Sequence, residues 1–291
     1  MGKLKQLTIY EKMTLALFRG KITRMVTFIC LGLWSLTTIY PLFWVVNNSL
    51  KPSHQVINDS FSVATNPTLT NYLNAFEQVD IGQSYLNSFI MSGGTVLLTL
   101  LVGGLAAYVL ARFRFRLRGL LQTVLVASLL IPAFATVVPV FGMLKDLQLL
   151  NTYWALIIPH TAGFLPFTIL VLSSYMATIP KDLEEAAIMD GCSRFAIFWR
   201  IMLPVSRPAF ITASIFVFLW SYNDLFSALI FVPQEDVRPI NVLLTTVSSQ
   251  YGTDYGLLAA AVTLTLIPVI VLYSVAQKYV IKGLTSGAVK G

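Results

Sequence analysis

The residues best suited to specific chemistry lie in one polar segment, residues 178–207, which mixes balanced charge with small side chains. The segment opens with the sequence TIPKDLEEAAIMDG. Proline suits a first helical turn, acidic side chains favour the positive end of the helix dipole, and glycine commonly follows a helix end. We therefore expect a short helix near residues 180–190. Leu183, Ala186 and Ala187 should share one face of this helix, and the two adjacent alanines leave that face shallow.

A second short amphipathic segment follows within the same polar segment. Its apolar members are Phe195, Phe198, Trp199 and Met202. It ends at Leu203-Pro204. From the pattern alone, this segment fits an interfacial helix among the lipid headgroups, where aromatic and arginine side chains are stable. A surface that contacts another protein is the alternative.

Three polar residues in a row, Tyr222, Asn223 and Asp224, interrupt an otherwise apolar stretch. A carboxylate at membrane depth costs about 2.5 to 3.5 kcal/mol on insertion scales, so Asp224 should face protein or a wet cavity. The three residues are candidates for a translocation pathway, and a hydrogen bond or salt bridge between helices explains Asp224 equally well. His160 lies beside Pro159 in another apolar stretch and is best interpreted as a packed, hydrogen-bonded residue rather than a proton relay.

Several kinds of chemistry are excluded or unsupported. No lysine is followed by serine or threonine, so the phosphate-binding pattern G-x-x-x-x-G-K-[ST] is absent and the chain should not hydrolyse ATP. A membrane enzyme would need several polar groups that converge near one face, and the sequence shows no such cluster. Cys30 and Cys192 lack the spacing of a disulfide framework or a metal site. We therefore expect no catalytic residue, no metal and no cofactor in this chain.

The composition places these residues in a membrane protein. Of 291 residues, 56% are hydrophobic and 11% are charged, whereas about a quarter of the residues of a soluble domain are charged. Runs of about 18 or more apolar residues can cross the bilayer as helices. The net charge of +7 does not indicate nucleic-acid binding, because the basic residues lie between apolar stretches rather than on one water-facing surface.

Six apolar stretches of this kind predict an all-α, polytopic membrane protein that forms one domain, residues 1–291. The predicted transmembrane helices lie near residues 25–47, 84–111, 119–144, 153–177, 208–232 and 257–280. Pro132 and Pro139 should bend or break the third helix. Residues 47–83, rich in Asn, Ser, Thr and Pro, have the composition of an exposed loop.

The distribution of lysine and arginine predicts the orientation. Seventeen of the 20 such residues lie in the N-terminal segment 1–24, in the second and fourth loops, or near the C-terminus, which ends in the tail 281–291. Short loops rich in these residues are retained on the cytoplasmic side during insertion. Both termini and the loop 178–207, between helices 4 and 5, should therefore be cytoplasmic.

Residues 185–204 resemble the loop pattern of permeases in ATP-binding-cassette (ABC) importers, written E-A-A, three residues, G, nine residues, I, one residue, L-P. Every fixed position is occupied, and Asp190 supplies the common A-x-x-D-G variant. The matching residues are Glu185, Ala186, Ala187, Gly191, Ile201, Leu203 and Pro204. The resemblance implies that the helix near residues 180–190 is a coupling helix, which sits in a groove on an ATPase subunit and moves when two such subunits close on ATP.

Other segments resemble the carbohydrate group of these permeases, the maltose-type importers. Residues 106–113 (AAYVLARF) look like that group's second-span ending, and residues 149–152 (LLNT) look like its third-to-fourth-span region. Residues 283–291 look like the tail of the shorter permease of a heterodimeric pair, which reaches between the ATPase subunits. The resemblance would place an extended segment there, formed by Gly287, Ala288, Val289, Lys290 and Gly291. Tyr222 is a departure, because the family often has tryptophan at this position.

The resemblance implies a complete machine in a bacterial or archaeal cytoplasmic membrane. It would contain a sister permease, two ATPase subunits that bind ATP and Mg²⁺, and an external solute-binding protein that contacts residues 47–83 and 234–256. The substrate would be a sugar of oligosaccharide size. An ABC importer permease for another solute, such as phosphate, a polyamine or a peptide, is one alternative. An ion-coupled secondary transporter is another, but it would need charged residues in several spans, where only Asp224 and His160 qualify.

Overall fold

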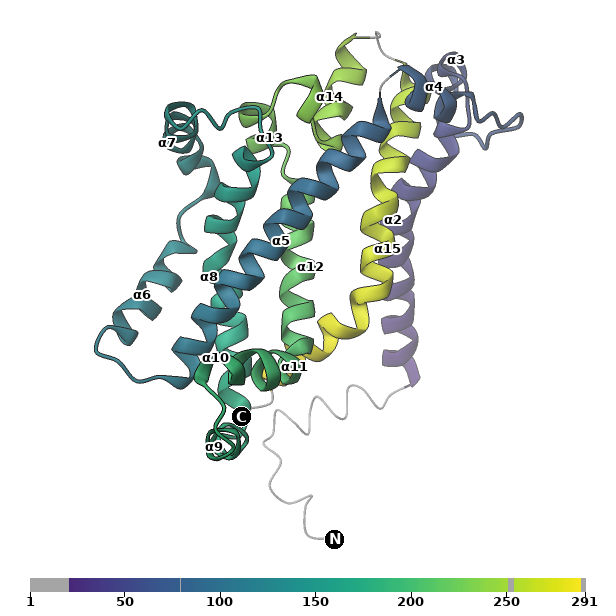
Figure 1. Ribbon diagram of the computed structural model, residues 1–291. Helices are drawn as coiled ribbons and strands as arrows, with labels where there is room; N and C mark the ends of the chain where they lie inside the picture. Colours follow the sequence, from purple (N-terminus) through teal and green to yellow (C-terminus); the bar gives the residue numbers. More distant parts are fainter. Residues whose placement is uncertain (1–20, 79, 251–253, 289–291) are drawn as a thin grey trace.

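The computed structural model describes residues 21–78, 80–250 and 254–288 (Figure 1). Every regular element within these residues is a helix, so the predicted all-helical class is confirmed. The longer helices are α2 (Lys21–Ser49), α5 (Ile81–Arg112), α6 (Arg118–Ser128), α7 (Ala133–Asp146), α8 (Trp154–Thr178), α12 (Arg207–Asn223), α14 (Ile240–Gln250) and α15 (Tyr255–Ala288). The shorter ones are α3 (Ser53–Asn58), α4 (Thr70–Gln78), α9 (Asp182–Met189), α10 (Arg194–Ile197), η1 (Phe198–Met202), α11 (Leu203–Val205), α13 (Phe226–Phe231) and η2 (Glu235–Val237).

Four of the helices are long and apolar enough to cross a membrane on their own: α2 over Thr23–Ser49, α5, α8, and α15 over Tyr255–Val275. Two bent pairs meet the same criteria when each pair is taken together. They are α6 with α7, bent by 102°, and Arg194–Val205 with α12, bent by 79°. The described residues therefore contain four to six candidate spans. A multi-pass chain is confirmed, and the count of six stays a prediction.

The predicted third span is two helices rather than one. α6 ends at Ser128, and Pro132 directly precedes the first turn of α7. Proline lacks a backbone N–H and has an extended backbone here, so the chain changes direction by 102°. The predicted break is confirmed at Pro132, whereas Pro139 lies inside α7 without ending it.

The predicted fifth span, residues 208–232, is also interrupted. α12 ends at Asn223, and Asp224 has an extended backbone before α13 begins. Oδ1 of Asp224 accepts a hydrogen bond from the N–H of Ser227 (3.2 Å), and the side chain of Asn241 donates to the Asp224 carbonyl (2.6 Å). Because these local bonds compete with helical ones, the prediction of one continuous helix through residue 232 is wrong.

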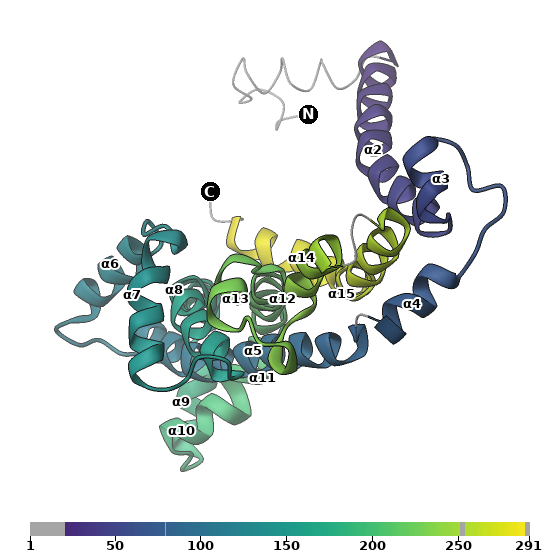
Figure 2. The ribbon, with the colours of Figure 1, turned by 90° about the horizontal axis from the view of Figure 1, so that it is seen from above.

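The long helices form an arc when the bundle is viewed along its axis (Figure 2). α6 and α7 lie at one end of the arc, α8, α12 and α15 follow, and α2 lies at the other end. α5 runs along the convex side. α2 packs against α15, and its residues 23–46 are all exposed or half-buried within the chain.

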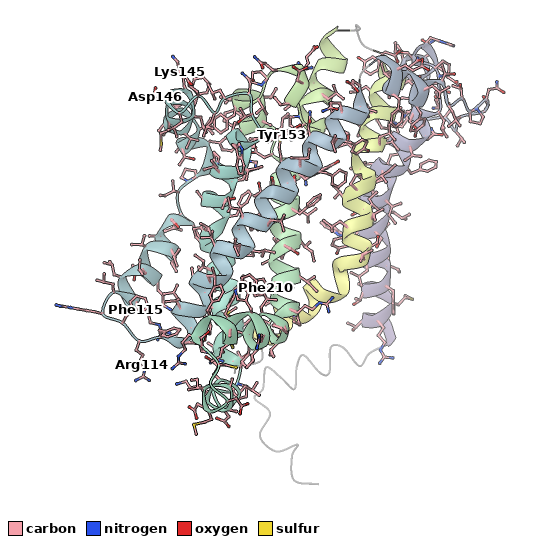
Figure 3. The ribbon with its side chains drawn as sticks, in the orientation of Figure 1. Arg114, Phe115, Lys145, Asp146, Tyr153 and Phe210 are labelled. Carbon is pink, nitrogen blue, oxygen red and sulfur yellow. The ribbon has the colours of Figure 1, made fainter. Side chains whose placement is uncertain are left out.

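The two ends of the bundle carry different short helices (Figure 1). α9, α10, η1 and α11 lie where α2 begins and α15 ends, and we call this the α9 end. α3, α4, α13 and α14 lie at the opposite end, which we call the α14 end. Arg114 and Phe115 lie at the α9 end, whereas Lys145 and Asp146 lie at the α14 end (Figure 3).

The segment between α2 and α5 forms two short helices around a buried lysine, which its loop-like composition did not predict. The side chain of Lys51 is fully buried, and its Nζ donates to the carbonyl oxygens of Asp59 (3.0 Å) and Ser62 (2.6 Å). The side chain of Asn71 donates to the carbonyl oxygens of Ser49 and Lys51, both at 2.8 Å. These bonds hold the segment against the end of α2.

α5 packs closely along α8 and α12 at glycine residues. A Cβ atom at Gly94 would lie 2.8 Å from the side chain of Ile157 in α8, and one at Gly104 would lie 2.8 Å from the ring of Phe210 in α12. The largest buried cluster extends from this contact toward the α9 end. Its members include Ala107, Tyr108, Leu110, Leu172, Met176, Ala187, Phe198 and Met202. The core therefore joins α5 and α8 to the short helices at the α9 end.

Candidate functional site

The predicted helix near residues 180–190 is confirmed as α9. Its end depends on glycine, because Gly191 has a φ of +79°, in the left-handed region that this residue adopts most readily. The N–H groups of Gly191 and Cys192 donate to the carbonyl oxygens of Ile188 and Ala187, both at 2.9 Å. This pair of hydrogen bonds is the Schellman motif that closes many helices.

One side of α9 faces the rest of the protein, and the other side is exposed. Glu184 and Ala187 are buried, with exposures of 5% and 6%, whereas Leu183 and Ala186 are exposed. Leu183, Ala186 and Ala187 have the predicted helical spacing in α9, but α9 is rotated so that Ala187 points inward and the other two do not. Met189 belongs to the outward side and is 86% exposed.

The rotation of α9 follows from an ion pair between Glu184 and Arg112, the last residue of α5. Both side chains are 6% exposed. Arg112 also donates to the carbonyl oxygen of Ile179 (2.8 Å), and the hydroxyl of Tyr108 donates to Oε2 of Glu184 (3.2 Å). Burying a charge is costly unless it is paired and hydrogen-bonded. These contacts therefore determine which side of α9 faces the bundle.

The second part of the loop is divided between the core and the surface. It forms α10, the π-helical turn η1 and α11. Phe198 and Met202 are buried, and the ring of Phe198 lies 5.6 Å from the ring of Tyr108. Phe195 and Trp199 are exposed instead. Of the predicted apolar members, these two are the ones accessible to lipid or to a partner.

The residues that match the loop pattern lie in three different environments. The exposed ones are Glu185, Ala186, Asp190, Gly191 and Pro204, the half-buried ones are Ile201 and Leu203, and the buried one is Ala187. α9 projects beyond the neighbouring helices at its end of the bundle (Figure 1). Four of the five exposed residues therefore lie on or directly after a projecting helix, where another protein can reach them.

The predicted C-terminal tail is helical as far as it is described. Gly287 and Ala288 continue α15, so the extended conformation expected for residues 287–291 is wrong for these two residues. No proline follows Pro268 to stop the helix earlier. The predicted contacts of Val289, Lys290 and Gly291 fall outside the described residues.

An open cavity of about 930 Å³ lies between α7, α8, α12 and α13. Its wall is mainly apolar and includes Trp220, with His160, Asn223 and Asp224 among its polar groups. Tyr222 lies in a separate buried cluster, and its ring stacks on Phe218 at 5.5 Å. Two of the three predicted pathway residues thus lie at the cavity, and Tyr222 lies on another side of α12.

His160 links α8 to the end of α12 beside this cavity. Its Nδ1 lies 3.0 Å from Oγ of Ser221, and its Nε2 lies 2.7 Å from Oδ2 of Asp224. The interpretations of His160 as a packed, hydrogen-bonded residue and of Asp224 as an interhelical contact are confirmed. The same carboxylate also forms part of the cavity wall.

Sequence reasoning missed the contact between Glu184 and Arg112. It assigned Glu184 to the helix dipole and Arg112 to cytoplasmic retention, and each assignment explained the residue without a partner. The only signal was an arginine at the end of an apolar span together with two adjacent glutamates in a later loop. That pattern does not say which glutamate turns inward.

Asn87 is a second residue that the sequence did not single out. It is fully buried in α5, and its side chain donates to the carbonyl oxygens of Asp236 (3.0 Å) and Arg238 (3.1 Å). Its Oδ1 accepts a hydrogen bond from the hydroxyl of Tyr153 (2.9 Å), which lies just before α8 (Figure 3). Asn87 therefore fixes the segment before α14 to the other end of α5.

Comparison with known proteins agrees with this arrangement. Residues 99–286 match the family model described as the binding-protein-dependent transport system inner membrane component. The chain is 36% identical to YurM of Bacillus subtilis, whose name describes an ABC transporter permease, over 90% of this chain and 87% of that protein. It is 35% identical to NgcG of Streptomyces coelicolor, a diacetylchitobiose uptake system permease protein, over 88% of this chain and 85% of that protein. The fold is similar to that of a chain in a bacterial ABC transporter involved in the import of the acidic polysaccharide alginate, with a TM-score of 0.80, 24% identity, and coverage of 89% of this chain and 96% of that one.

Proposed function

Because this chain belongs to the family of binding-protein-dependent transport system inner membrane components, we propose that it is the permease subunit of an ABC importer for a sugar. It is a multi-pass protein of the inner membrane. The observation that carries the proposal is the alignment with transport permeases, which covers 90% of the chain for YurM. The chain supplies the membrane path, and ATP is hydrolysed by other subunits, since the sequence has no phosphate-binding loop.

Two observations support a sugar as the substrate. NgcG, a permease for diacetylchitobiose uptake, is 35% identical to this chain over 88% of its length. In addition, the segments AAYVLARF and LLNT resemble the carbohydrate group of these permeases. We infer a substrate of oligosaccharide size, which reaches the cytoplasm by alternating access of the bundle to the two sides of the membrane.

The proposed topology has six spans, with each bent helix pair counted as one, and a cytoplasmic α9 end. The excess of lysine and arginine in the segments near this end supports the orientation, and Arg114 marks it (Figure 3). The proposed partners are a sister permease that forms a heterodimer with this chain, two ATPase subunits carrying ATP and Mg²⁺, and an external solute-binding protein at the α14 end. The absence of buried residues over residues 23–46 of α2 supports a further membrane subunit or lipid beside this helix.

The outward side of α9 is the proposed contact with an ATPase subunit. Glu185 would form a hydrogen bond or an ion pair there, while Ala186 and Gly191 permit close approach. Ala187 contributes from the inside, because it packs α9 against the bundle. We also propose that the residues after Gly287 reach the ATPase subunits, since α15 ends at the α9 end (Figure 1).

The cavity beside Asn223 is the proposed sugar-contacting surface of this chain, and replacing Asn223 with alanine tests it. Asn223 is exposed, and its Nδ2 bonds to its own helix at the carbonyl of Leu219 (2.8 Å). One hydrogen bond contributes about 1 kcal/mol, so Asn223→Ala should weaken the apparent affinity for the sugar about fivefold. The dependence of the uptake rate on sugar concentration measures this apparent affinity.

Thr38→Ala is a matched control, because the Thr38 hydroxyl also donates a hydrogen bond to the carbonyl four residues earlier, but Thr38 lies on α2, away from the cavity. An unchanged affinity in Asn223→Ala would exclude this surface.

The proposed function is tested by reconstitution of the whole assembly. The chain is copurified with its sister permease and ATPase subunits and placed in vesicles, and the solute-binding protein is added with a panel of labelled oligosaccharides, phosphate, a polyamine and a peptide. We expect accumulation of one or more sugars that requires ATP and stops with ADP. Uptake driven by an ion gradient without ATP, or uptake of a non-sugar solute alone, would contradict the proposal.

A further inference from the structure

We propose that the ion pair between Arg112 and Glu184 is the joint through which α5 moves together with α9. Arg112 and Glu184 are then positioning residues for energy coupling, distinct from the outward residues of α9 that contact the ATPase. The inference rests on the proposed function, because it assumes that α9 is the element moved by ATP.

The first observation is the isolation of the ion pair from water. Both side chains are 6% exposed, and both have additional hydrogen bonds, from Tyr108 to Glu184 and from Arg112 to the carbonyl of Ile179. The charges of an exposed ion pair are solvated by water when they separate, so such a pair contributes little to stability. When a buried pair separates, each charge is left buried without a partner, which is costly. α9 and the end of α5 therefore move as one unit rather than independently.

The second observation concerns how else α9 is attached. The chain connects it to α8 through residues 179–181 and to α10 through residues 190–193. Such short non-helical connections are able to bend at their backbone dihedral angles. The other inward-facing side chain of α9 is that of Ala187, which packs in the buried cluster but forms no directional contact. The directional ties between α9 and a long helix are therefore the contacts of Glu184 with two residues of α5, the ion pair with Arg112 and the weaker hydrogen bond from Tyr108.

The third observation is the nature of α5 itself. It is a continuous helix of 32 residues, about 48 Å long at 1.5 Å per residue. At its far end, Asn87 holds the carbonyl oxygens of Asp236 and Arg238, and Oγ of Ser88 accepts a hydrogen bond from the N–H of Ile240 (2.8 Å). α5 thus carries a buried polar joint at each end, one to α9 and one to the segment before α14.

These contacts give a physical route between the two ends of the bundle. A displacement of α9 moves Arg112 and hence α5, and α5 displaces the segment that begins α14. α5 should move as a rigid body, because its close contacts at Gly94 with α8 and at Gly104 with α12 leave no room for it to bend locally. The proposed docking site of the solute-binding protein is thereby connected to the proposed ATPase contact.

The test separates coupling from folding by neutralising both partners. Arg112→Gln or Glu184→Gln alone leaves one buried charge unpaired and should reduce assembly. The double variant leaves no unpaired charge, so the amount of assembled complex and its melting temperature should recover. The sugar transported per ATP hydrolysed should nevertheless stay about tenfold below that of the unmodified assembly. Arg114→Gln is the matched control, since Arg114 is an exposed arginine two residues after Arg112, and it should have the unmodified ratio.

The outcomes decide the proposal in both directions. An unmodified ratio of sugar to ATP in the double variant would overturn the joint, and so would an equal loss in Arg114→Gln. Arg112→Lys keeps the charge but loses the planar guanidinium of arginine. A ratio of sugar to ATP in Arg112→Lys that lies between those of the double variant and the unmodified assembly would support the joint.

A spectroscopic measurement tests the joint even where the double variant assembles poorly. Spin labels at Arg114 and Lys181, both exposed, report the distance between the end of α5 and the start of α9, in a background with Cys30→Ser and Cys192→Ala. The distance should be the same in the nucleotide-free assembly and after trapping with ATP and vanadate. A change of distance with the ion pair intact would overturn the joint. Because this measurement needs nucleotide but no transported solute, it decides the joint separately from the proposed function, which fails if the unmodified assembly takes up no sugar with ATP.

Discussion

Replacing Gly191 with valine is expected to lower ATP-driven sugar uptake about 100-fold, the upper range of coupling between two sites, while the chain still inserts into the membrane. The reason is local. Gly191 has a φ of +79°, which a β-branched side chain rarely adopts. Valine would therefore disturb the two hydrogen bonds that close α9, and the outward side of α9 would no longer present a fixed surface to the ATPase.

The measurement compares uptake with the amount of copurified ATPase subunit. Gly191→Asn is the conservative counterpart, because asparagine tolerates the left-handed region better than other residues with a side chain, and it should retain most of the uptake. Gly119→Val is the control for bulk, since a Cβ atom at Gly119 in α6 meets no atom within 4 Å. Unmodified uptake in Gly191→Val would show that the end of α9 has no part in coupling.

Replacing Gly256 with alanine is expected to have the largest effect on stability among the glycine positions whose surroundings the structure describes. A Cβ atom there would lie 2.6 Å from the backbone oxygen of Lys51 and 2.8 Å from Nδ2 of Asn71. Neither neighbour has room to move, because the Lys51 side chain is fully buried and Asn71 donates to that same oxygen. Overpacking of this kind costs about 1 to 3 kcal/mol, so the thermal denaturation midpoint of the purified chain should fall by several degrees.

Gly93→Ala is the matched control for this substitution. Gly93 lies inside α5, and a Cβ atom there meets no atom within 4 Å. Alanine is favoured over glycine in a helix interior by about 0.5 to 1 kcal/mol, so the midpoint should stay the same or rise slightly. If Gly256→Ala melts at the same temperature as Gly93→Ala, the contact between α15 and the segment after α2 does not limit stability.

The sequence determined those features that depend on neighbouring residues. Long apolar runs dictate membrane-spanning helices, because each backbone polar group must be satisfied within its own helix in lipid. Pro132 dictates a break for a similarly local reason, since its ring removes a donor. The start and end of α9 also follow from the sequence, because acidic residues, small residues and Gly191 lie in a fixed order along a few turns.

Only the tertiary structure decided how these elements face one another. Glu184 and Glu185 are adjacent and chemically alike, and the choice of Glu184 as the inward one depends on Arg112 at the end of a helix far back in the sequence. The same holds for Asp224, whose bonds to His160 of α8 and to Ser227 and Asn241 farther along the chain help end α12 where hydropathy predicted that it would continue. A residue's type sets which bonds it is able to form, but a buried polar group takes the partner that packing brings within about 3 Å, and that distance is a property of the assembled bundle.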